Sequence, residues 1–346
     1  MKNEHWMISL QKVFYPFLVI IGVPSNTITF MIFWRRSCGL SPSCRCYLMA
    51  ISVADTLVLI QIVLLEMILQ YYTIEPFWTR VPWCMIRDVF SYGAYNASVW
   101  LVVCFTIERF FAIKTRHLKP KICTKKCSLC IIASVFICSH AFSIPYFWSN
   151  ESRHLNGTNR FTCVYNNHLP SFYVEGLVWF QATLVYIIPY IIIFALNGSI
   201  LKHICNSNKV QCETFRDRRS FSSFTRSKKQ KRKSVVLLVT VSMTFAYLCT
   251  TRFVTQIMIK TLYYNINRKD YTKTINVAAD IGTMLDLTNA AVNMYLYACT
   301  QYRFRKELLE IAKAVKSCKL YEKQKHKHVI FFVHYSKYPP KKALVG

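Results

Sequence analysis

The stretch VFYPFLVIIGVPSNTITFMIFW, residues 13–34, contains no charged side chain. A helix needs about 20 consecutive apolar residues to cross the hydrocarbon core of a bilayer. Within lipid, only a helix satisfies all of its backbone hydrogen bonds inside one segment. The stretch is therefore predicted to be a membrane-spanning helix. Because it lacks a small-residue cleavage site, we expect it to be retained rather than removed as a signal peptide.

Six further stretches have similar length and hydropathy in this chain of 346 residues, of which 53% are hydrophobic. This pattern predicts an all-α integral membrane protein whose core is a bundle of seven transmembrane helices. The predicted spans are 13–34, 46–70, 84–113, 126–148, 174–201, 234–260 and 273–299. The predicted organisation is a short extracellular N-terminus (1–12), the bundle (13–300), an amphipathic membrane-surface helix (301–316) and a basic tail (317–346).

The net charge of +28 is concentrated between the spans and in the tail. The segment from Lys114 to Lys126 carries six basic residues and no acidic one. Basic loops stay on the cytoplasmic side, so we expect the N-terminus outside and the C-terminus inside the plasma membrane. This placement beside membrane spans argues against a nucleic-acid partner.

Cysteine placement agrees with this topology. Of fifteen cysteines, only Cys84 and Cys163 fall on the oxidising side. A disulfide between them would hold the 149–173 loop over the bundle. The same loop contains two glycosylation sequons, at Asn150 and Asn156.

Several polar residues lie within the predicted spans, where an ionisable group is costly and marks a functional site. Asp55, Ser98, Asn289 and Asn293 supply one carboxylate together with hydroxyl and amide oxygens. Such a set can hold a small hard cation such as sodium. It is equally consistent with a water-filled hydrogen-bond network that contains no ion.

Motifs spread over about residues 13–316 together resemble the rhodopsin-like (class A) G-protein-coupled receptors. They are Asn26 after Gly-x-Pro, the Ala-Asp55 pair, Cys84 twenty-five residues before Arg109, Pro189, and Asn293 to Tyr297. The resemblance implies that Asp55, Ser98, Asn289 and Asn293 surround an allosteric sodium ion, with no other metal or cofactor expected.

Glu108-Arg109-Phe110 resembles the Asp/Glu-Arg-Tyr triplet of that family. The resemblance implies that Glu108 holds the guanidinium of Arg109 at rest. It also implies that the released arginine reaches the G protein, with Asn293 and Tyr297 completing the switch. The alternative is an interfacial arginine that extends toward water. Beyond the surface helix, Cys318 is a candidate for palmitoylation, or a free thiol.

The chain departs from the family pattern in spans six and seven. Cys249 and Thr251 stand where the family has tryptophan and proline, and Met294 stands where span seven usually has proline. These departures support an alternative function, a non-signalling seven-helix receptor that acts as a decoy or heteromer partner.

The expected ligand site is a cavity between the outer halves of spans three, five, six and seven. Arg252 in span six is the most informative residue, because its fork suits a ligand carboxylate or C-terminal amide carbonyl. The alternative is a structural ion pair with Glu66 or Asp286. The predicted ligand-contact residues are Arg252, Gln256, Thr255, Tyr92, Asp88, Arg87, Gln181, Glu66, Asp280 and Thr283.

Within the class, Ser143-Ile-Pro-Tyr-Phe-Trp148, Arg252 and the segment from Asn289 are similar to orphan receptors that respond to aromatic amino acids, and to related receptors for FMRFamide-like neuropeptides. The expected function is binding of a small extracellular ligand, a peptide or amino-acid-like molecule, and activation of a heterotrimeric G protein. Nothing resembles a catalytic constellation, so we expect no enzyme activity. Membrane lipids are expected at the Lys-rich tail, and arrestin, if it binds, at the serines between spans five and six.

Overall fold

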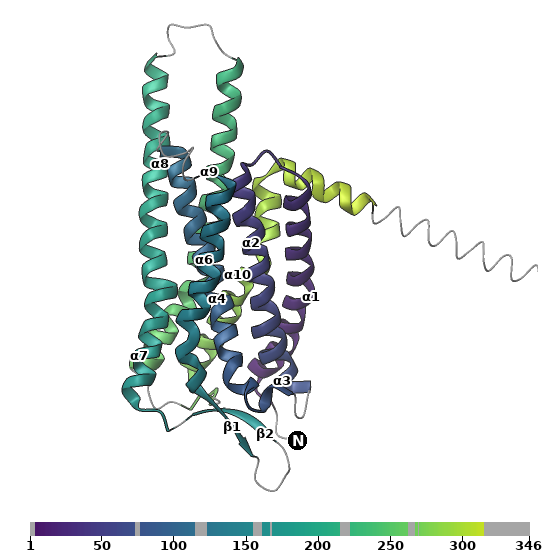
Figure 1. The fold of residues 1–346 in the computed structure, drawn as a ribbon, viewed down its shortest axis with the longest axis vertical. Coiled ribbons are helices and arrows are strands. Elements are labelled where there is room, and N and C mark those ends of the chain that lie inside the picture. The colour runs from purple at the N-terminus through teal and green to yellow at the C-terminus, as the bar shows by residue number, and fades with distance from the viewer. Residues whose placement is uncertain are drawn as a thin grey trace, which may run out of the picture.

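The computed structural model describes residues 4–72, 77–114, 123–154, 161–166, 168–214, 222–261, 267–268 and 270–314. For residues 70–71, 203–214 and 222–234 it describes the backbone alone. Seven long helical spans lie side by side as a bundle (Figure 1). The prediction of an all-α seven-helix membrane protein is confirmed.

The spans are numbered here in chain order. Spans one to three are formed by α1 (Trp6–Arg35), by α2 (Pro42–Val58) with η1 (Leu59–Ile68) and α3 (Leu69–Tyr72), and by α4 (Trp83–Lys114), which follows the short turn η2 (Phe77–Thr79). Span four is α6 (Lys125–Ser143) with η3 (Ile144–Ser149), and is followed by the strands β1 (Asn150–His154) and β2 (Phe161–Tyr165). Spans five to seven are α7 (Ser171–Ala182) with η4 (Thr183–Ile187) and α8 (Ile188–Thr214), then α9 (Ser222–Thr261), then α10 (Thr274–Thr300).

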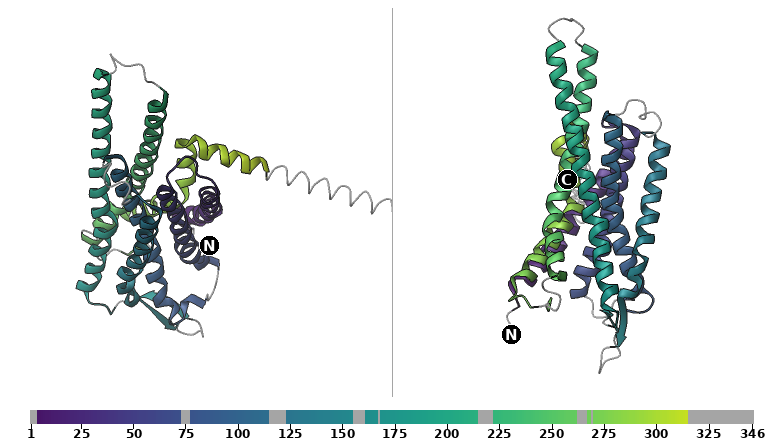
Figure 2. Two further views of the ribbon diagram at one scale, coloured as in Figure 1. Left: turned by 45° about the horizontal axis from the view of Figure 1, so that its top comes forward. Right: turned by 90° about the vertical axis from the view of Figure 1, so that its left-hand side faces the viewer.

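The two ends of the bundle differ, as the views in Figure 2 show. The N-terminus and the β1–β2 hairpin lie at one end, which we call the disulfide end. At the opposite end, called the Arg109 end, α8 and α9 extend beyond the other helices (Figures 1 and 2). The first helix begins at Trp6, earlier than the predicted start at residue 13.

Six of the spans are long and apolar enough to cross a membrane by length and hydropathy alone, and α10 is not among them. It carries Asp280, Asp286 and Asn293, which lower its hydropathy. The side chains of Asp286 and Asn293 are buried within the bundle rather than exposed to lipid. Their partners on other helices, described below, explain how so polar a segment completes the bundle.

The outer surface is apolar, the reverse of a protein that faces water. On α1, Val13, Phe17 and Ile20 are 71%, 63% and 70% exposed at helical spacing. Exposed side chains of this size would be unfavourable in water over so large an area. They are suited to contact with lipid.

Helix ends and irregular turns follow from local sequence. Ser41 caps α2 by accepting a hydrogen bond from the amide of Cys44 (3.3 Å), and Pro42 occupies the first turn, where it needs no partner. In span five, Pro189 has no N–H for the carbonyl of Val185. The turn just before this proline, η4, is widened to a π-helix.

A further helix over residues 302–314 leaves the Arg109 end of α10 and runs across the bundle axis (Figure 1). Phe304 is fully buried against Phe33 and Tyr297, whereas its basic neighbours face outward. This arrangement fits the predicted amphipathic surface helix. Burial beside this helix, together with the Glu307 carboxylate, raises the pKa of the Cys38 thiol to about 11, which keeps it protonated.

The backbones of α9 and α10 come into contact at Gly282. A Cβ atom added there would lie 2.9 Å from the backbone nitrogen and 3.0 Å from the Cα of Arg252. Among its neighbours, α10 packs most extensively against α9. The absence of a side chain at Gly282 therefore permits the close approach of α9 and α10.

Replacing Gly282 with alanine should push α9 and α10 apart and destabilise the protein by about 1–3 kcal/mol. The measurement is the melting temperature of the purified protein in detergent. Gly198→Ala in α8, where an added Cβ meets nothing within 4 Å, is the matched control. Equal melting temperatures for the two variants would contradict the close approach.

Candidate ligand-binding site

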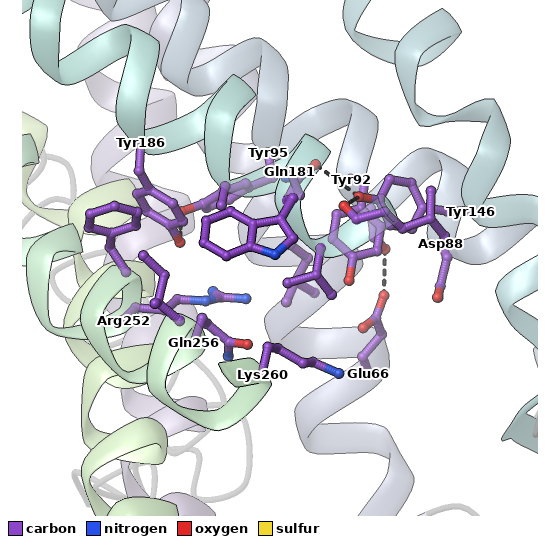
Figure 3. Close-up of a pocket in the computed structure, with 18 of the residues that line it drawn as sticks. Glu66, Asp88, Tyr92, Tyr95, Tyr146, Gln181, Tyr186, Arg252, Gln256 and Lys260 are labelled. Atoms are coloured by element: carbon purple, nitrogen blue, oxygen red, sulfur yellow. Dashed lines mark hydrogen bonds between the residues drawn. The ribbon is translucent and has the colours of Figure 1, made fainter. Parts of the chain in front are cut away.

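A cavity of 320 Å³ lies between the helices toward the disulfide end (Figure 3). Its volume is at the lower end of the range of about 300–1,000 Å³ typical of small-molecule sites. Side chains from η1, α4, η3, α7, η4 and α9 line it. Of the ten predicted ligand-contact residues, seven line this cavity: Glu66, Arg87, Asp88, Tyr92, Gln181, Arg252 and Gln256.

The other three predicted residues do not line the cavity. Thr255 and Thr283 donate hydrogen bonds to carbonyls of their own helices, those of Thr251 and Ala279, both at 2.9 Å. Such bonds satisfy a hydroxyl locally, where no water is available. The structure therefore corrects their predicted place in the site.

Asp280 is occupied elsewhere. Its carboxylate accepts hydrogen bonds from Gln11 at 2.8 Å and Tyr271 at 2.7 Å, and pairs with Arg268 at 3.0 Å. These contacts join α1, α10 and the segment before α10 at the disulfide end. Asp280 is thus a structural residue in this arrangement, not a cavity residue.

One wall of the cavity carries a charge cluster from span two and α4. Arg87 donates to one oxygen of Asp88 through two nitrogens, both at 3.2 Å, and lies 3.8 Å from Glu66. Ser91 donates to the same Glu66 oxygen at 2.5 Å. One guanidinium is therefore shared by two carboxylates.

The opposite wall contains Arg252, for which the sequence left two interpretations open. The structure contains the ion pair: the guanidinium of Arg252 lies 2.6 Å from Asp286 of α10. The other oxygen of Asp286 accepts a hydrogen bond from Tyr95 of α4 at 2.6 Å. The Asp286 side chain is fully buried, whereas that of Arg252 is 24% exposed. Arg252 thus lines the cavity with its charge already balanced.

Several cavity residues were missed by the sequence analysis. Lys260 follows Gln256 by four residues, so it lies one helical turn further along the same face of α9, and that spacing could have identified it. Tyr146 stacks on Tyr92 with ring centroids 3.9 Å apart and donates to the carbonyl of Leu177 at 3.0 Å. The sequence pointed to Tyr146 only as part of the segment Ser143–Trp148 and did not place it in the site, because its partners come from different helices.

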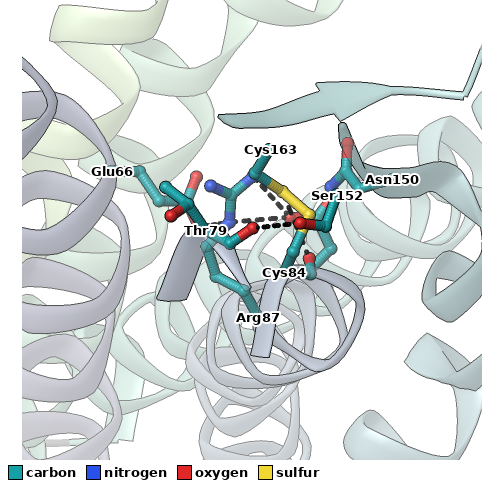
Figure 4. The surroundings of a disulfide bond; sticks show 8 residues. Glu66, Thr79, Cys84, Arg87, Asn150, Ser152 and Cys163 are labelled. Atoms are coloured by element: carbon teal, nitrogen blue, oxygen red, sulfur yellow. Dashed lines mark hydrogen bonds and ion pairs between the residues drawn. A yellow bond between two sulfur atoms is a disulfide. The ribbon is translucent and has the colours of Figure 1, made fainter. Parts of the chain in front are cut away.

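A disulfide joins Cys84 at the start of α4 to Cys163 of β2, as predicted (Figure 4). The strands pair antiparallel, with Ser152 of β1 opposite Cys163. Ser152 also donates to the carbonyl of Thr79 at 2.6 Å. The hairpin is therefore held over the bundle by one covalent and one hydrogen-bonded link.

Asn150 adds a third link between the hairpin and the bundle. Its side chain is only 7% exposed, and its amide nitrogen donates to Asp88 at 2.6 Å. That nitrogen is the atom to which a glycan would be attached. A glycan at Asn150 would have to be accommodated in this buried position, which disfavours that site, whereas Asn156 lies outside the described residues.

The predicted polar network is found in the middle of the bundle. Ser98 donates to one oxygen of Asp55 and Asn293 to the other, both at 2.6 Å. Asn289 is half-buried, and its side chain makes no hydrogen bond to any described residue. Asp55 and Ser98 offer oxygens that suit sodium, but Asn293 presents its nitrogen, so ion binding would require its amide to rotate. The sodium ion stays a prediction.

At the Arg109 end, Glu108 and Arg109 form a buried ion pair. Glu108 also accepts a hydrogen bond from Ser43 at 2.9 Å, and Arg109 donates to Ser41 at 3.0 Å. Glu108 therefore holds the guanidinium against the start of α2. Tyr297 is fully buried, and its hydroxyl makes no hydrogen bond within the part of the chain that the structure describes. Cys318 lies outside the described residues.

Removing Arg252 should destabilise the protein because Asp286 would be left buried without a counter-ion. We expect Arg252→Gln to cost about 3–5 kcal/mol. The double variant Arg252→Gln/Asp286→Asn should recover most of this loss, since neither charge then remains. Melting temperatures of the purified proteins measure both effects. If the stability losses caused by Arg252→Gln and by Asp286→Asn simply add in the double variant, a direct ion pair between the two residues is contradicted.

The buried position of Asn150 predicts a single glycan on this loop, at Asn156. On expression in mammalian cells, Asn156→Gln should remove the mobility shift that glycosidase treatment produces on a gel. Asn150→Gln should leave that shift unchanged. A smaller shift in the Asn150→Gln protein would show that Asn150 carries a glycan and leaves its contact with Asp88.

The family model for the seven-transmembrane receptors of the rhodopsin family matches residues 25–297. Among curated proteins, the chain is similar to the mouse Probable G-protein coupled receptor 142, with 24% identity over 86% of this chain and 72% of the relative. It is also similar to the Danio rerio Apelin receptor A, with 22% identity over 89% of this chain and 84% of the relative. The Bombyx mori Allatostatin-A receptor is 24% identical over 85% of this chain and 76% of the relative.

The family match covers well over half of the chain and spans the bundle described above. It includes the Asp55 network, the Arg109 ion pair and every residue that lines the cavity. The chain therefore belongs to the rhodopsin family of seven-transmembrane receptors, and is a non-enzymatic, multi-pass receptor of the plasma membrane.

Proposed function

We propose that the receptor binds a small extracellular ligand, a peptide or an amino-acid-like molecule, in the 320 Å³ cavity, and then activates a heterotrimeric G protein. The observation that supports this proposal is the cavity, because it is concave, lies between helices and combines aromatic walls with a few charged groups. The names of the apelin and allatostatin-A receptors indicate peptide ligands for those relatives, which supports a ligand of this chemistry here.

The proposed orientation places the disulfide end outside the cell and the Arg109 end inside. A disulfide such as Cys84–Cys163 persists in the oxidising extracellular environment. The opposite end carries the basic segments, which remain cytoplasmic. The cavity then opens toward the ligand, and Arg109 faces the G protein.

The proposed signal runs along α9 and α10. A ligand that contacts Gln256 acts on a helix whose other end reaches beyond the bundle at the Arg109 end. Arg252 pairs with Asp286 one turn below Gln256, so a change at the cavity also acts on α10. A ligand shifts such an equilibrium only by its difference in affinity for the two arrangements.

The test is a ligand screen on cells that express the receptor, with amino acids, amidated peptides and steroids as probes and G-protein activation as the readout. We expect activation by a peptide or amino-acid-like probe, loss of activation in Arg109→Ala, and about tenfold lower potency in Gln256→Ala. Thr283→Ala is the matched control, because Thr283 does not line the cavity. All variants are compared at equal surface expression.

Two outcomes would contradict the proposal. Equal signalling by wild type and Arg109→Ala would remove Arg109 from the coupling mechanism. Ligand binding without activation of any G protein would instead establish the non-signalling alternative.

A further inference from the structure

We propose that the ligand of this cavity is zwitterionic, with a cationic group bound by Glu66 and a carboxylate bound by Lys260. This inference rests on the proposed role of the cavity as the ligand site, and it names the chemistry of the ligand. Both side chains line the cavity, from span two and from α9 (Figure 3).

On the wall formed by span two and α4, one negative charge is left without a full partner. Both oxygens of Asp88 are satisfied, one by Arg87 and the other by Asn150. Arg87 is 3.8 Å from the nearer oxygen of Glu66, which is an ion-pair distance but too long for a hydrogen bond. The second Glu66 oxygen accepts no hydrogen bond from the described residues. Two carboxylates thus share one guanidinium, and the remaining negative charge lies on Glu66.

The wall formed by α9 carries an unpaired positive charge instead. Arg252 is neutralised by Asp286 at 2.6 Å, so it offers little net charge to a ligand. Lys260, two turns further along the helix, forms no ion pair or hydrogen bond with any residue for which the structure gives a position. It also forms no ion pair with Glu66. One positive charge therefore remains on Lys260.

Uncompensated charges that are partly removed from water are unfavourable, and a ligand that supplies both counter-charges relieves them together. A ligand with one charge would leave either Glu66 or Lys260 unpaired. The volume of 320 Å³ fits a free amino acid, a dipeptide or one end of a longer peptide. The aromatic rings that line the cavity favour an apolar or aromatic ligand side chain. These rings belong to Tyr92, Tyr95, Tyr146, Trp179, Tyr186 and Phe253.

The first experiment measures binding without any G protein. The purified full-length receptor in detergent is mixed with free amino acids and dipeptides that carry large apolar side chains. Each is compared with its N-acetylated and its C-amidated derivative by thermal shift and calorimetry. We expect the free zwitterions to stabilise the receptor, and each blocked derivative to bind at least about tenfold more weakly.

Variants then assign each charge to its side chain. Lys260→Gln should abolish the preference for a free carboxylate over its amide, but retain the preference for a free amine. Glu66→Gln should do the reverse. Lys273→Gln and Glu175→Gln are matched controls, because both residues are exposed outside the cavity, and they should retain both preferences.

Equal binding of free and blocked probes would overturn the proposal, as would the absence of binding by every zwitterion at millimolar concentration. A failure of the proposed function can be distinguished from a failure of this ligand assignment. Zwitterion binding without G-protein activation would refute signalling and leave the ligand assignment intact. G-protein activation by singly charged or neutral ligands, with zwitterions inert, would refute the ligand assignment alone.

Discussion

The rest of the structure depends on how the polar side chains of α10 are satisfied inside a bilayer. Hydrocarbon offers no hydrogen bonds, so each buried polar group must find its partner within the protein. Asp280 binds Gln11 of α1, Asp286 binds Arg252 of α9 and Tyr95 of α4, and Asn293 binds Asp55 of α2. These contacts fix α10 against four other spans at three depths. These polar contacts thus fix the position of α10, the span with too little hydropathy to be identified by composition alone.

The same contacts connect the two functional ends of the receptor. The Arg252–Asp286 pair borders the cavity, and the Asp55 network lies between it and the Arg109 end. Spans six and seven lack the prolines typical of the family, and α9 is a single unbroken helix. Polar contacts between neighbouring helices, rather than a proline hinge, are therefore the features on which a conformational change can act. The close approach at Gly282 means that a displacement of α9 at this point also acts on α10.

The sequence predicted features that depend on one segment or one compartment. The spans follow from about twenty apolar residues each, and the Cys84–Cys163 pairing follows from topology. Seven of the ten predicted ligand-contact residues line the cavity, because helical spacing places them on inward faces. Thr255 and Thr283 were misplaced because spacing does not show that a hydroxyl bonds to its own helix. The choice between Glu66 and Asp286 as the partner of Arg252, and the burial of Asn150, depend on residues distant in the chain, which no local pattern reports.

The hairpin over the bundle has a mechanical consequence. A disulfide and the Asn150–Asp88 hydrogen bond attach it to α4 at the disulfide end of the bundle, while Arg109 lies at the other end of that helix. A helix fastened in this way is expected to stay in place while neighbouring helices move against it. We expect displacement on ligand binding to fall on α9, which has no link to the hairpin among the described residues. Since α9 is continuous from the cavity to beyond the bundle, it can act as a rigid lever. A small tilt of α9 at the cavity would then displace the other end of this helix, at the Arg109 end of the bundle, by a larger distance.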